Sequence, residues 1–242
     1  AQGVAAPVPP APAPLTAAGA RAAENAVRQA GDAFGTVVGR EEIGLYSADQ
    51  VRGFSPVDAG NVRIAGLYFD PVVFPSDRIS GATLIRVGPS ALGSPFPAPT
   101  GIVDLGLRVP GDAAGASLLV SGDGWGSGGV ELDAALPVTE GFSLGLGAAA
   151  GLNRFFNATR SDGVEGAVIA RIAPSPDFEL VPFLSFAWTP LDDNGVTYLP
   201  AGETLPPRLP RRLFVGPFWA RSRGAEWLAG SVGLWRPAPD WE

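Results

Sequence analysis

The sequence predicts a mainly β protein, in which a small mixed α+β domain is followed by a series of antiparallel strands. The chain of 242 residues contains 33 Gly and 25 Pro, so it turns often and long helices are not expected. Downstream of Leu118, apolar and polar residues alternate over strand-sized segments that are separated by turn residues. One segment, Ala17–Ala30, predicts a helix because it is rich in alanine and carries Glu24 and Arg28 at helical spacing.

The composition excludes several classes of protein. The chain has no Cys and no His, which removes disulfides, thiol nucleophiles, imidazole metal ligands and Ser-His-Asp triads. Its formal net charge of −7 argues against general binding of nucleic acid, which requires cations against the phosphates. No uninterrupted apolar run is long enough for a membrane-spanning helix.

The N-terminal part of the chain is predicted to hold a tail, a helix and a few short strands. Ala1–Thr16 is almost entirely Ala, Pro and Val and predicts an extended, polyproline-like tail before the helix. Strands are predicted at Val37–Tyr46 and Asn61–Phe69. A further apolar segment, Leu84–Val87, leads into a bend rich in Gly and Pro and then into a strand at Ile102–Val103.

Three short segments of this region resemble a known family. They are Val51-Arg52-Gly53-Phe54, Gly88-Pro89-Ser90-Ala91-Leu92-Gly93 and Gly101-Ile102-Val103-Asp104. In order, spacing and residue type they resemble the plug domain of TonB-dependent outer-membrane receptors of the siderophore-receptor type. The chain departs from the family pattern at Val87, where Glu or Arg is usual, lacks the usual Tyr before Gly93, and shows no recognisable energy-coupling segment in its tail.

The segments beyond residue 112 alternate as half-exposed strands do. In Val130–Leu136, Glu131 and Asp133 fall on one face and the apolar residues on the other. The pattern recurs in Phe142–Leu152, Val164–Ile172, Phe178–Trp188 and Glu226–Trp235. Short turns are predicted at Pro137–Gly141 and Pro174–Asp177, and longer links at Asn153–Gly163 and Asp192–Arg223. Taken alone, this pattern fits both a transmembrane β-barrel and a soluble β-sandwich.

The resemblance favours the barrel and implies the domain organisation. Residues 1–30 would form the tail and short helix, residues 31–112 the plug domain, and residues 113–242 the first strands, about six, of an antiparallel transmembrane β-barrel. Barrels of this kind have about 22 strands around a plugged lumen. Six strands make an incomplete barrel, so the chain is expected to be an N-terminal fragment of a larger receptor.

Seven residues are predicted to contact a ligand, because the resemblance places them in plug loops or in an external loop. They are Arg52, Tyr68, Phe69, Phe96, Arg211, Arg212 and Trp219. The arginines and aromatic residues of the Asp192–Arg223 link suit an anionic ferric chelate or anionic lipopolysaccharide. Structural roles remain open beside these, with Arg52 binding backbone carbonyls, the aromatic residues packing locally and the link lying free in solvent.

Charged residues are also predicted to join the plug to the barrel wall. The carboxylates of Glu131, Asp133 and Glu165 would face the lumen, and Arg86 is their candidate partner from the plug. Such pairing is expected because the desolvation cost of an unpaired buried charge is prohibitive.

The resemblance implies a receptor rather than an enzyme, located in the outer membrane of a Gram-negative bacterium, that imports a ferric siderophore or a similar scarce nutrient. Its partners would be outer-membrane lipid, the chelate, and the TonB energy-coupling complex through the N-terminal region. It would be a monomer, without a cofactor, iron entering only within the chelated ligand. The alternatives are a soluble secreted β-rich module that binds polysaccharide, and an enzyme that uses Asp192 and Asp193 for acid–base catalysis. Those two residues lie in a turn-like Asp-Asp-Asn-Gly segment, and turn formation explains them better than catalysis.

Overall fold

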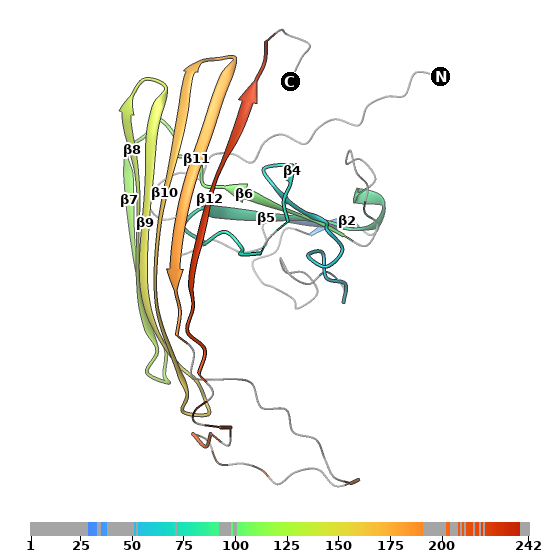
Figure 1. Ribbon diagram of the computed structural model, residues 1–242, viewed down its shortest axis with the longest axis vertical. Helices are drawn as coiled ribbons and strands as arrows, with labels where there is room; N and C mark the ends of the chain where they lie inside the picture. The colour runs from blue at the N-terminus through green and yellow to red at the C-terminus, as the bar shows by residue number, and fades with distance from the viewer. Residues whose placement is uncertain are drawn as a thin grey trace.

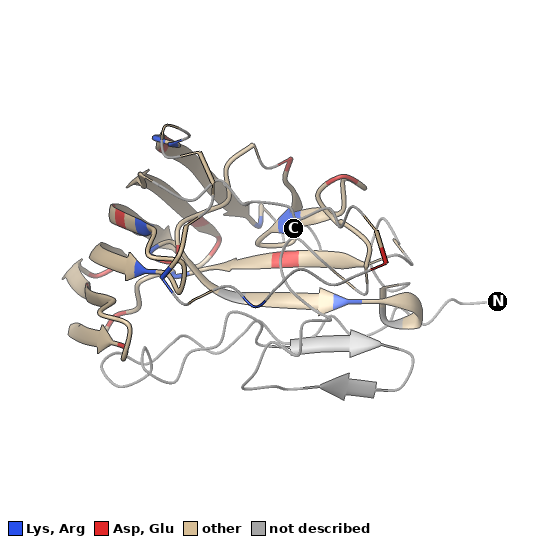
Figure 2. Ribbon diagram, turned by 90° about the horizontal axis from the view of Figure 1, so that it is seen from below, with Lys and Arg blue, Asp and Glu red and all other residues tan. Residues whose placement is uncertain are grey.

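The computed structural model of the chain contains two β-sheets. It describes residues 29–32, 35–37, 51, 53–70, 72–91, 98, 101–190, 202–203, 208, 210, 212–214, 216–217, 219 and 221–237. We call the sheet of short strands between residues 29 and 107 the inner sheet, and the sheet of long strands between residues 115 and 235 the outer sheet. The outer sheet is tall and curved, and the inner sheet lies against its concave face with its strands crossing the outer ones (Figure 1). In the view along the outer strands, the outer sheet curves around one side of the inner sheet (Figure 2).

The inner sheet combines parallel and antiparallel pairs. Its elements are β1 (Gln29–Asp32), β2 (Gly35–Val37), β3 (Val62–Ile64), β4 (Leu67–Tyr68), β5 (Ser80–Arg86), the 3-10 helix η2 (Gly88–Ala91) and β6 (Ile102–Leu107). The strand order is β2-β1-β5-β6-β3-β4. β1 pairs in parallel with β5, and β3 with β6, while the other pairs are antiparallel. Within the described residues, no helix has the length and hydropathy needed to cross a membrane.

Two predictions for this sheet need correction. Asn61–Phe69 does not form a single strand: Ala65 and Gly66 have φ of 50° and 82°, so the chain reverses there and β3 and β4 form a hairpin. The helix predicted for Ala17–Ala30 does not include its last two residues, because these belong to β1 and pair with β5. The rest of that helix lies outside the described residues, as does most of the strand predicted at Val37–Tyr46, of which Val37 ends β2.

The outer sheet is antiparallel throughout and follows the chain order. Its strands are β7 (Gly115–Gly122), β8 (Gly128–Thr139), β9 (Phe142–Arg154), β10 (Arg160–Ser175), β11 (Phe178–Trp188) and β12 (Ala225–Trp235). The six strands agree in number and order with the sequence pattern. The predicted short turns are confirmed, because β8–β9 and β10–β11 are each joined by two residues. In the first turn Gly141 has φ of 77°, and a Cβ there would lie 2.4 Å from the oxygen of Ala173, so only glycine fits.

The predicted long link at Asn153–Gly163 is wrong. β9 and β10 extend through most of this segment, since Arg154 pairs with Arg160, and five residues remain between the strands. The side chain of Asn157 closes this tip, because its oxygen accepts hydrogen bonds from the backbone nitrogen of Thr159 at 3.1 Å and from the hydroxyl of Thr159 at 2.6 Å.

The two faces of the outer sheet differ as the alternation predicts. The face turned away from the inner sheet leaves large apolar side chains exposed, among them Leu118 at 67%, Leu132 at 49% and Trp227 at 64%. The opposite face carries Glu131, Asp133 and the glycines of β9. A β-sandwich would bury its apolar face between two sheets, whereas here the apolar face of the outer sheet is the exposed one.

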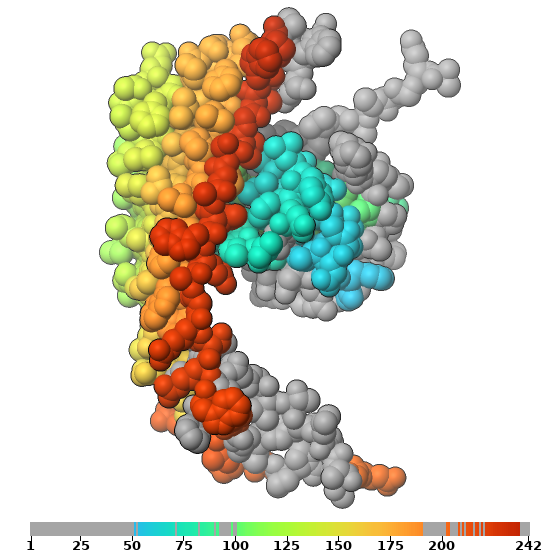
Figure 3. Space-filling view, in the orientation of Figure 1, coloured from blue at the N-terminus to red at the C-terminus, as the bar shows by residue number. Residues whose placement is uncertain are grey.

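The hydrophobic core lies between the two sheets. Figure 3 shows the residues of the inner sheet packed against the concave side of the outer sheet. From the inner sheet it includes Val62, Ile85 and Val103, which are at most 1% exposed. From the outer sheet it includes Ile169, Val181 and Phe183, and these join the same cluster. The concave face of the outer sheet is therefore partly apolar, which the sequence pattern did not indicate.

Candidate functional site

The most deeply buried charge that joins the two sheets belongs to Arg78. This residue lies in the loop before β5, next to the fully buried Ile79, and its side chain is 3% exposed. Its guanidinium forms ion pairs with Glu131 and Asp133 of β8 and with Glu165 of β10. The NH1 nitrogen lies 2.8 Å from Asp133 Oδ2, the Nε nitrogen lies 3.0 Å from Glu165 Oε1, and NH2 donates to Glu131 Oε2. One arginine of the inner region thus meets three carboxylates on two outer strands.

These contacts keep the Arg78 guanidinium charged. Burial opposes its charge, but the hydrogen bond to Glu131 and the charges of the three carboxylates outweigh burial and raise the pKa of Arg78. Ser76 supports the arrangement: its hydroxyl donates to Glu165 Oε2 at 2.6 Å and accepts from the backbone nitrogen of Arg78 at 3.1 Å. The arginine therefore reaches the outer sheet on a loop that is itself bonded to one of the carboxylates.

Two further arginines, Arg108 and Arg171, bind the segments around this contact. Arg108 Nε donates to the carbonyl oxygen of Asp77 at 2.7 Å and to that of Ser80 at 3.0 Å, which ties the Arg78 loop to the end of β6. Arg171 of β10 binds Asp112, in the segment between β6 and β7, at 3.2 Å. The segment that connects the sheets is thus bonded to the outer sheet as well.

The outer sheet carries a glycine at the point where Arg78 approaches it. A Cβ built on Gly147 of β9 would lie 2.8 Å from Arg78 Cβ and 2.9 Å from Asp133 Oδ1, distances at which the neighbouring atoms must move. Glycine at this position therefore makes room for the stem of the arginine.

The predicted ion-pair network has the right carboxylates and the wrong arginine. Glu131, Asp133 and Glu165 do face the inner sheet, but they bind Arg78. Arg86 cannot take this role, because its neighbour Ile85 is buried in the core between the sheets and alternation turns Arg86 to the other face of the inner sheet. There its charge acts on Asp104. Burial raises the pKa of Asp104, whereas the hydrogen bond from Gly66 and the charges of Arg86 and Arg63 lower it. The effect of burial is the largest, so the pKa of Asp104 is raised.

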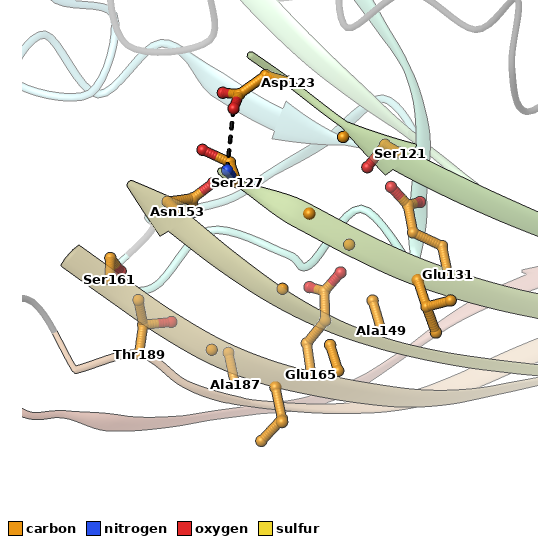
Figure 4. A pocket seen from close by; sticks show the side chains of 18 residues that line it. Ser121, Asp123, Ser127, Glu131, Ala149, Asn153, Ser161, Glu165, Ala187 and Thr189 are labelled. Atoms are coloured by element: carbon orange, nitrogen blue, oxygen red, sulfur yellow. Dashed lines mark hydrogen bonds between the residues drawn. The ribbon is translucent and has the colours of Figure 1, made fainter. Parts of the chain in front are cut away.

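A groove of about 480 Å³ adjoins the ion-pair cluster on the same face of the outer sheet. It extends from Glu131 and Glu165 toward the end of the sheet where β7–β8, β9–β10 and β11–β12 are connected, and Figure 4 shows the labelled side chains along it. Its polar residues are Ser121, Asp123, Ser127, Glu131, Asn153, Ser161, Glu165 and Thr189, and nearly all of the rest are Gly or Ala. At the rim, Asp123 Oδ1 accepts hydrogen bonds from the backbone nitrogens of Trp125 at 2.8 Å and Ser127 at 2.9 Å.

None of the seven residues predicted to bind a ligand lines this groove. Arg52, Phe96 and Arg211 lie outside the described residues. Tyr68 is 62% exposed on β4 and carries the guanidinium of Arg63 over its ring at 5.3 Å, and the adjacent Phe69 is partly buried against the core.

The two remaining predicted residues follow β11. Arg212 donates its backbone nitrogen to the oxygen of Phe156 at the β9–β10 tip, at 2.7 Å, and Trp219 is 74% exposed. The structure thus places Arg212 beside the groove-forming end of the sheet. The ligand-binding role of all seven residues stays a prediction.

The described residues contain no group of three or more His, Cys, Asp or Glu arranged to hold a metal ion. The three carboxylates around Arg78 are instead directed at a guanidinium. Apart from Glu165, the groove residues of β7, β9 and β10 were not singled out from the sequence, although their signal is present: serine, glycine and alanine recur on one face of these strands.

Comparison with known proteins identifies the fold. No family model and no curated protein matches the chain. Among solved structures, FpvA of P. aeruginosa in complex with iron and a heterologous pyoverdine matches with a TM-score of 0.63 and 15% identity over 78% of this chain. The ferripyoverdine receptor of the outer membrane of Pseudomonas aeruginosa, bound to ferripyoverdine, matches with a TM-score of 0.57 and 14% identity over 71% of this chain.

The chain spans about a quarter of the length of these receptors, 26% and 25% respectively. Identities this low show the architecture alone. The matched structures are those of outer-membrane receptors. The chain therefore has a TonB-dependent receptor-like fold.

Proposed function

We propose that the protein is a TonB-dependent receptor of a Gram-negative outer membrane that imports a ferric siderophore. In this proposal the outer sheet is part of the wall of a transmembrane barrel and the inner sheet belongs to the plug that fills its lumen. The two-residue turns would face the periplasm and the longer connections the outside, as in barrels of known orientation. The groove would then open toward the external medium.

The observation that carries the proposal is the buried contact of Arg78 with Glu131, Asp133 and Glu165. Charged groups lie on the concave face of the outer sheet, while its convex face exposes leucine, valine and tryptophan. This distribution suits a wall with lipid outside and a polar, filled lumen inside, and is the reverse of a soluble protein. The polysaccharide-binding sandwich loses support for the same reason.

The character of the contact also suits a plug that must move. An ion pair in a lumen can exchange its partner for water when the plug shifts, whereas a fully apolar interface would expose hydrophobic surface. We expect TonB, pulling on the N-terminal region, to separate Arg78 from its carboxylates while the ligand passes. Arg52, Tyr68, Phe69, Phe96, Arg211, Arg212 and Trp219 are proposed as ligand contacts in the same receptor.

The test is to fractionate cells that make the complete gene product, grown with and without iron. The proposal predicts a heat-modifiable protein in the outer membrane whose amount rises in iron-poor medium, and uptake of radioactive ferric chelate that stops when TonB is deleted. Outer-membrane protein that is indifferent to iron would refute the siderophore cargo and keep the receptor. Protein found in the medium or in the soluble fraction would refute both.

A further inference from the structure

Two arginines lie opposite each other across β9 and β10 on the convex face of the outer sheet. Arg154 of β9 and Arg160 of β10 are directly paired in the register of the two strands, so their side chains share one face. Their neighbours Asn153 and Ser161 line the groove on the concave face (Figure 4), and alternation therefore turns both arginines to the convex face. The pair stands at the end of the sheet where five residues connect β9 to β10.

The side chain of Arg154 is accessible to a ligand. It is 36% exposed, and among the described residues its guanidinium forms one ion pair, with Asp162 at 4.0 Å. That distance is too long for a hydrogen bond, and Asp162 Oδ1 is shielded from solvent without a hydrogen-bond partner in the described part of the chain. The backbone of Arg154 is held in place, because its nitrogen donates to the hydroxyl of Ser127 at 3.0 Å. Arg160 is exposed and adds a second guanidinium to the same face, where a bound anion would lower the repulsion between the two.

The convex face changes from charged to aromatic residues along the strands. Trp188, at the end of β11, pairs with Val164, which lies further along β10 than Arg160. Trp227 of β12 pairs with Phe186 of β11, and their ring centroids are 4.4 Å apart. In membrane barrels a band of aromatic residues marks the boundary between headgroups and hydrocarbon. In the orientation of the proposed function, the two arginines therefore lie at the level of the headgroups of the outer leaflet.

An apolar groove of about 460 Å³ adjoins the aromatic residues on this face. Phe186 and Trp227 line it together with Leu, Val, Ala and Gly residues, and no charged residue takes part. The small residues Ala148 and Gly166 pair across β9 and β10, and exposed leucines such as Leu146 line the groove beside them. A lining of this kind suits a hydrocarbon chain and offers nothing to a polar ligand.

Resting on the proposed function, we infer that this face holds a phosphorylated glycolipid of the outer leaflet, which in a Gram-negative outer membrane is lipopolysaccharide. A phosphate group would lie between Arg154 and Arg160, since guanidinium groups bind phosphate oxygens through paired hydrogen bonds. A hydroxyl or amide group of the phosphorylated sugar would donate to Asp162 Oδ1. An acyl chain would extend past Trp188 into the apolar groove. The site thus requires a phosphate and a hydrocarbon chain in one molecule, which a free phosphate ion does not provide.

The test compares lipid A that carries its phosphates with the same lipid A after removal of the phosphates, so that the acyl chains are unchanged. The complete gene product is purified from outer membranes, stripped of bound lipid in detergent and titrated with each form. Native mass spectrometry measures the fraction of protein that carries a lipid. We expect the phosphorylated form to bind about tenfold more tightly, from the attraction of the two arginines less the repulsion of Asp162. An excess of inorganic phosphate should not displace it.

Variants assign the preference to the arginine pair. Arg154→Gln and Arg160→Gln should each lower the affinity for phosphorylated lipid A about fivefold, the usual effect of one cation near an anionic lipid. Asp162→Asn removes the opposing charge and retains an oxygen that can accept from the sugar, so that affinity should rise. Arg236→Gln is the matched control, because Arg236 follows β12 at the other end of the sheet, where its backbone nitrogen donates to Asp177. It should leave the affinity for both forms unchanged.

The outcomes separate this inference from the proposed function. Equal affinities for the two forms, unchanged binding in both arginine variants, or displacement by inorganic phosphate would overturn the lipid site. In each of these cases the receptor stands, as long as the protein is found in the outer membrane and takes up ferric chelate. If the protein is absent from the outer membrane, the proposed function fails, and the inference falls with it.

Discussion

At the scale of single residues, the position of Arg78 depends on the absence of a side chain opposite it. The guanidinium reaches Glu131 and Asp133 because its stem passes over Gly147, where a Cβ would lie 2.8 Å from Arg78 Cβ. A charge that is 3% exposed is stable only while its partners are in place. The geometry of the contact is thus set by a small residue as much as by the charged ones.

Gly147→Ala is expected to displace Arg78 and lower the free energy of unfolding by about 1–3 kcal/mol, the usual cost of overpacking. The measurement is chemical unfolding of the complete gene product in detergent. Gly151→Ala is the matched control on the same strand and face, because a Cβ there would meet only the oxygen of Gly128, at 3.9 Å. Equal stability of the two variants would contradict the tight approach at Gly147.

Asp104→Asn tests the electrostatics of the inner sheet. Burial raises the pKa of Asp104 above its ordinary value, so the folded protein binds the proton more readily than the unfolded chain. Stability is then lost as pH rises from that value through the folded pKa. The variant, which can still accept from the Gly66 nitrogen, should be more stable than the parent at pH 7 and lose that advantage in acid. Unfolding curves across this pH range measure the difference in stability between variant and parent. An advantage of the variant that grows toward low pH would contradict the raised pKa of Asp104.

At the scale of elements, β11 shows how one strand serves two environments. Phe183 faces the core between the sheets and is 9% exposed, while Phe186, on the other face, contacts Trp227 with ring centroids 4.4 Å apart and the ring planes tilted by 44°. The sequence pattern identified the convex face of this strand but not the apolar residues on its concave face. An alternation rule assigns polar residues to one side, and it misses a patch that is apolar because another sheet covers it.

Replacing each phenylalanine by alanine distinguishes the two faces. Phe183→Ala removes a ring from a packed core and should cost about 3–5 kcal/mol in the free energy of unfolding. Phe186→Ala removes a ring contact next to detergent or lipid and should cost about 1 kcal/mol. Unfolding of both variants in the same detergent compares them, and a larger cost for Phe186 would argue that the concave face is not the packed one.

The elements also show which features a sequence can predict. The antiparallel outer strands and the short turns at Pro137–Gly141 and Pro174–Asp177 followed from a period of two and from turn residues. The β3–β4 hairpin did not, because Val62 and Ile64 alternate with Arg63 and Ala65 as they would in one strand. The chain instead reverses through a positive φ at Ala65, which no pattern requires of alanine. Arg78 was missed because loop residues carry no periodicity, so its partners were found and the arginine was not.

At the scale of the whole molecule, the two sheets depend on each other. The concave face of the outer sheet has a polar part, where carboxylates and a glycine surround Arg78, and an apolar part beside it. The inner region supplies the arginine to the first part and packs apolar side chains against the second. The groove is the part of this face that the inner sheet leaves uncovered among the described residues. The carboxylates of Glu131 and Glu165 therefore line the groove and also hold the inner sheet in place.

The crossing of the two sets of strands has a mechanical consequence. β1 is the first strand of the chain that the structure describes, and three residue pairs join it to β5. Because the inner strands cross the outer ones, a force applied at Gln29 along the outer strands acts across β1 and not along it (Figure 1). The β1–β5 pairs would then carry the load in succession, as in peeling, and a small force acting over a long distance would suffice where shearing would require all of them to break together.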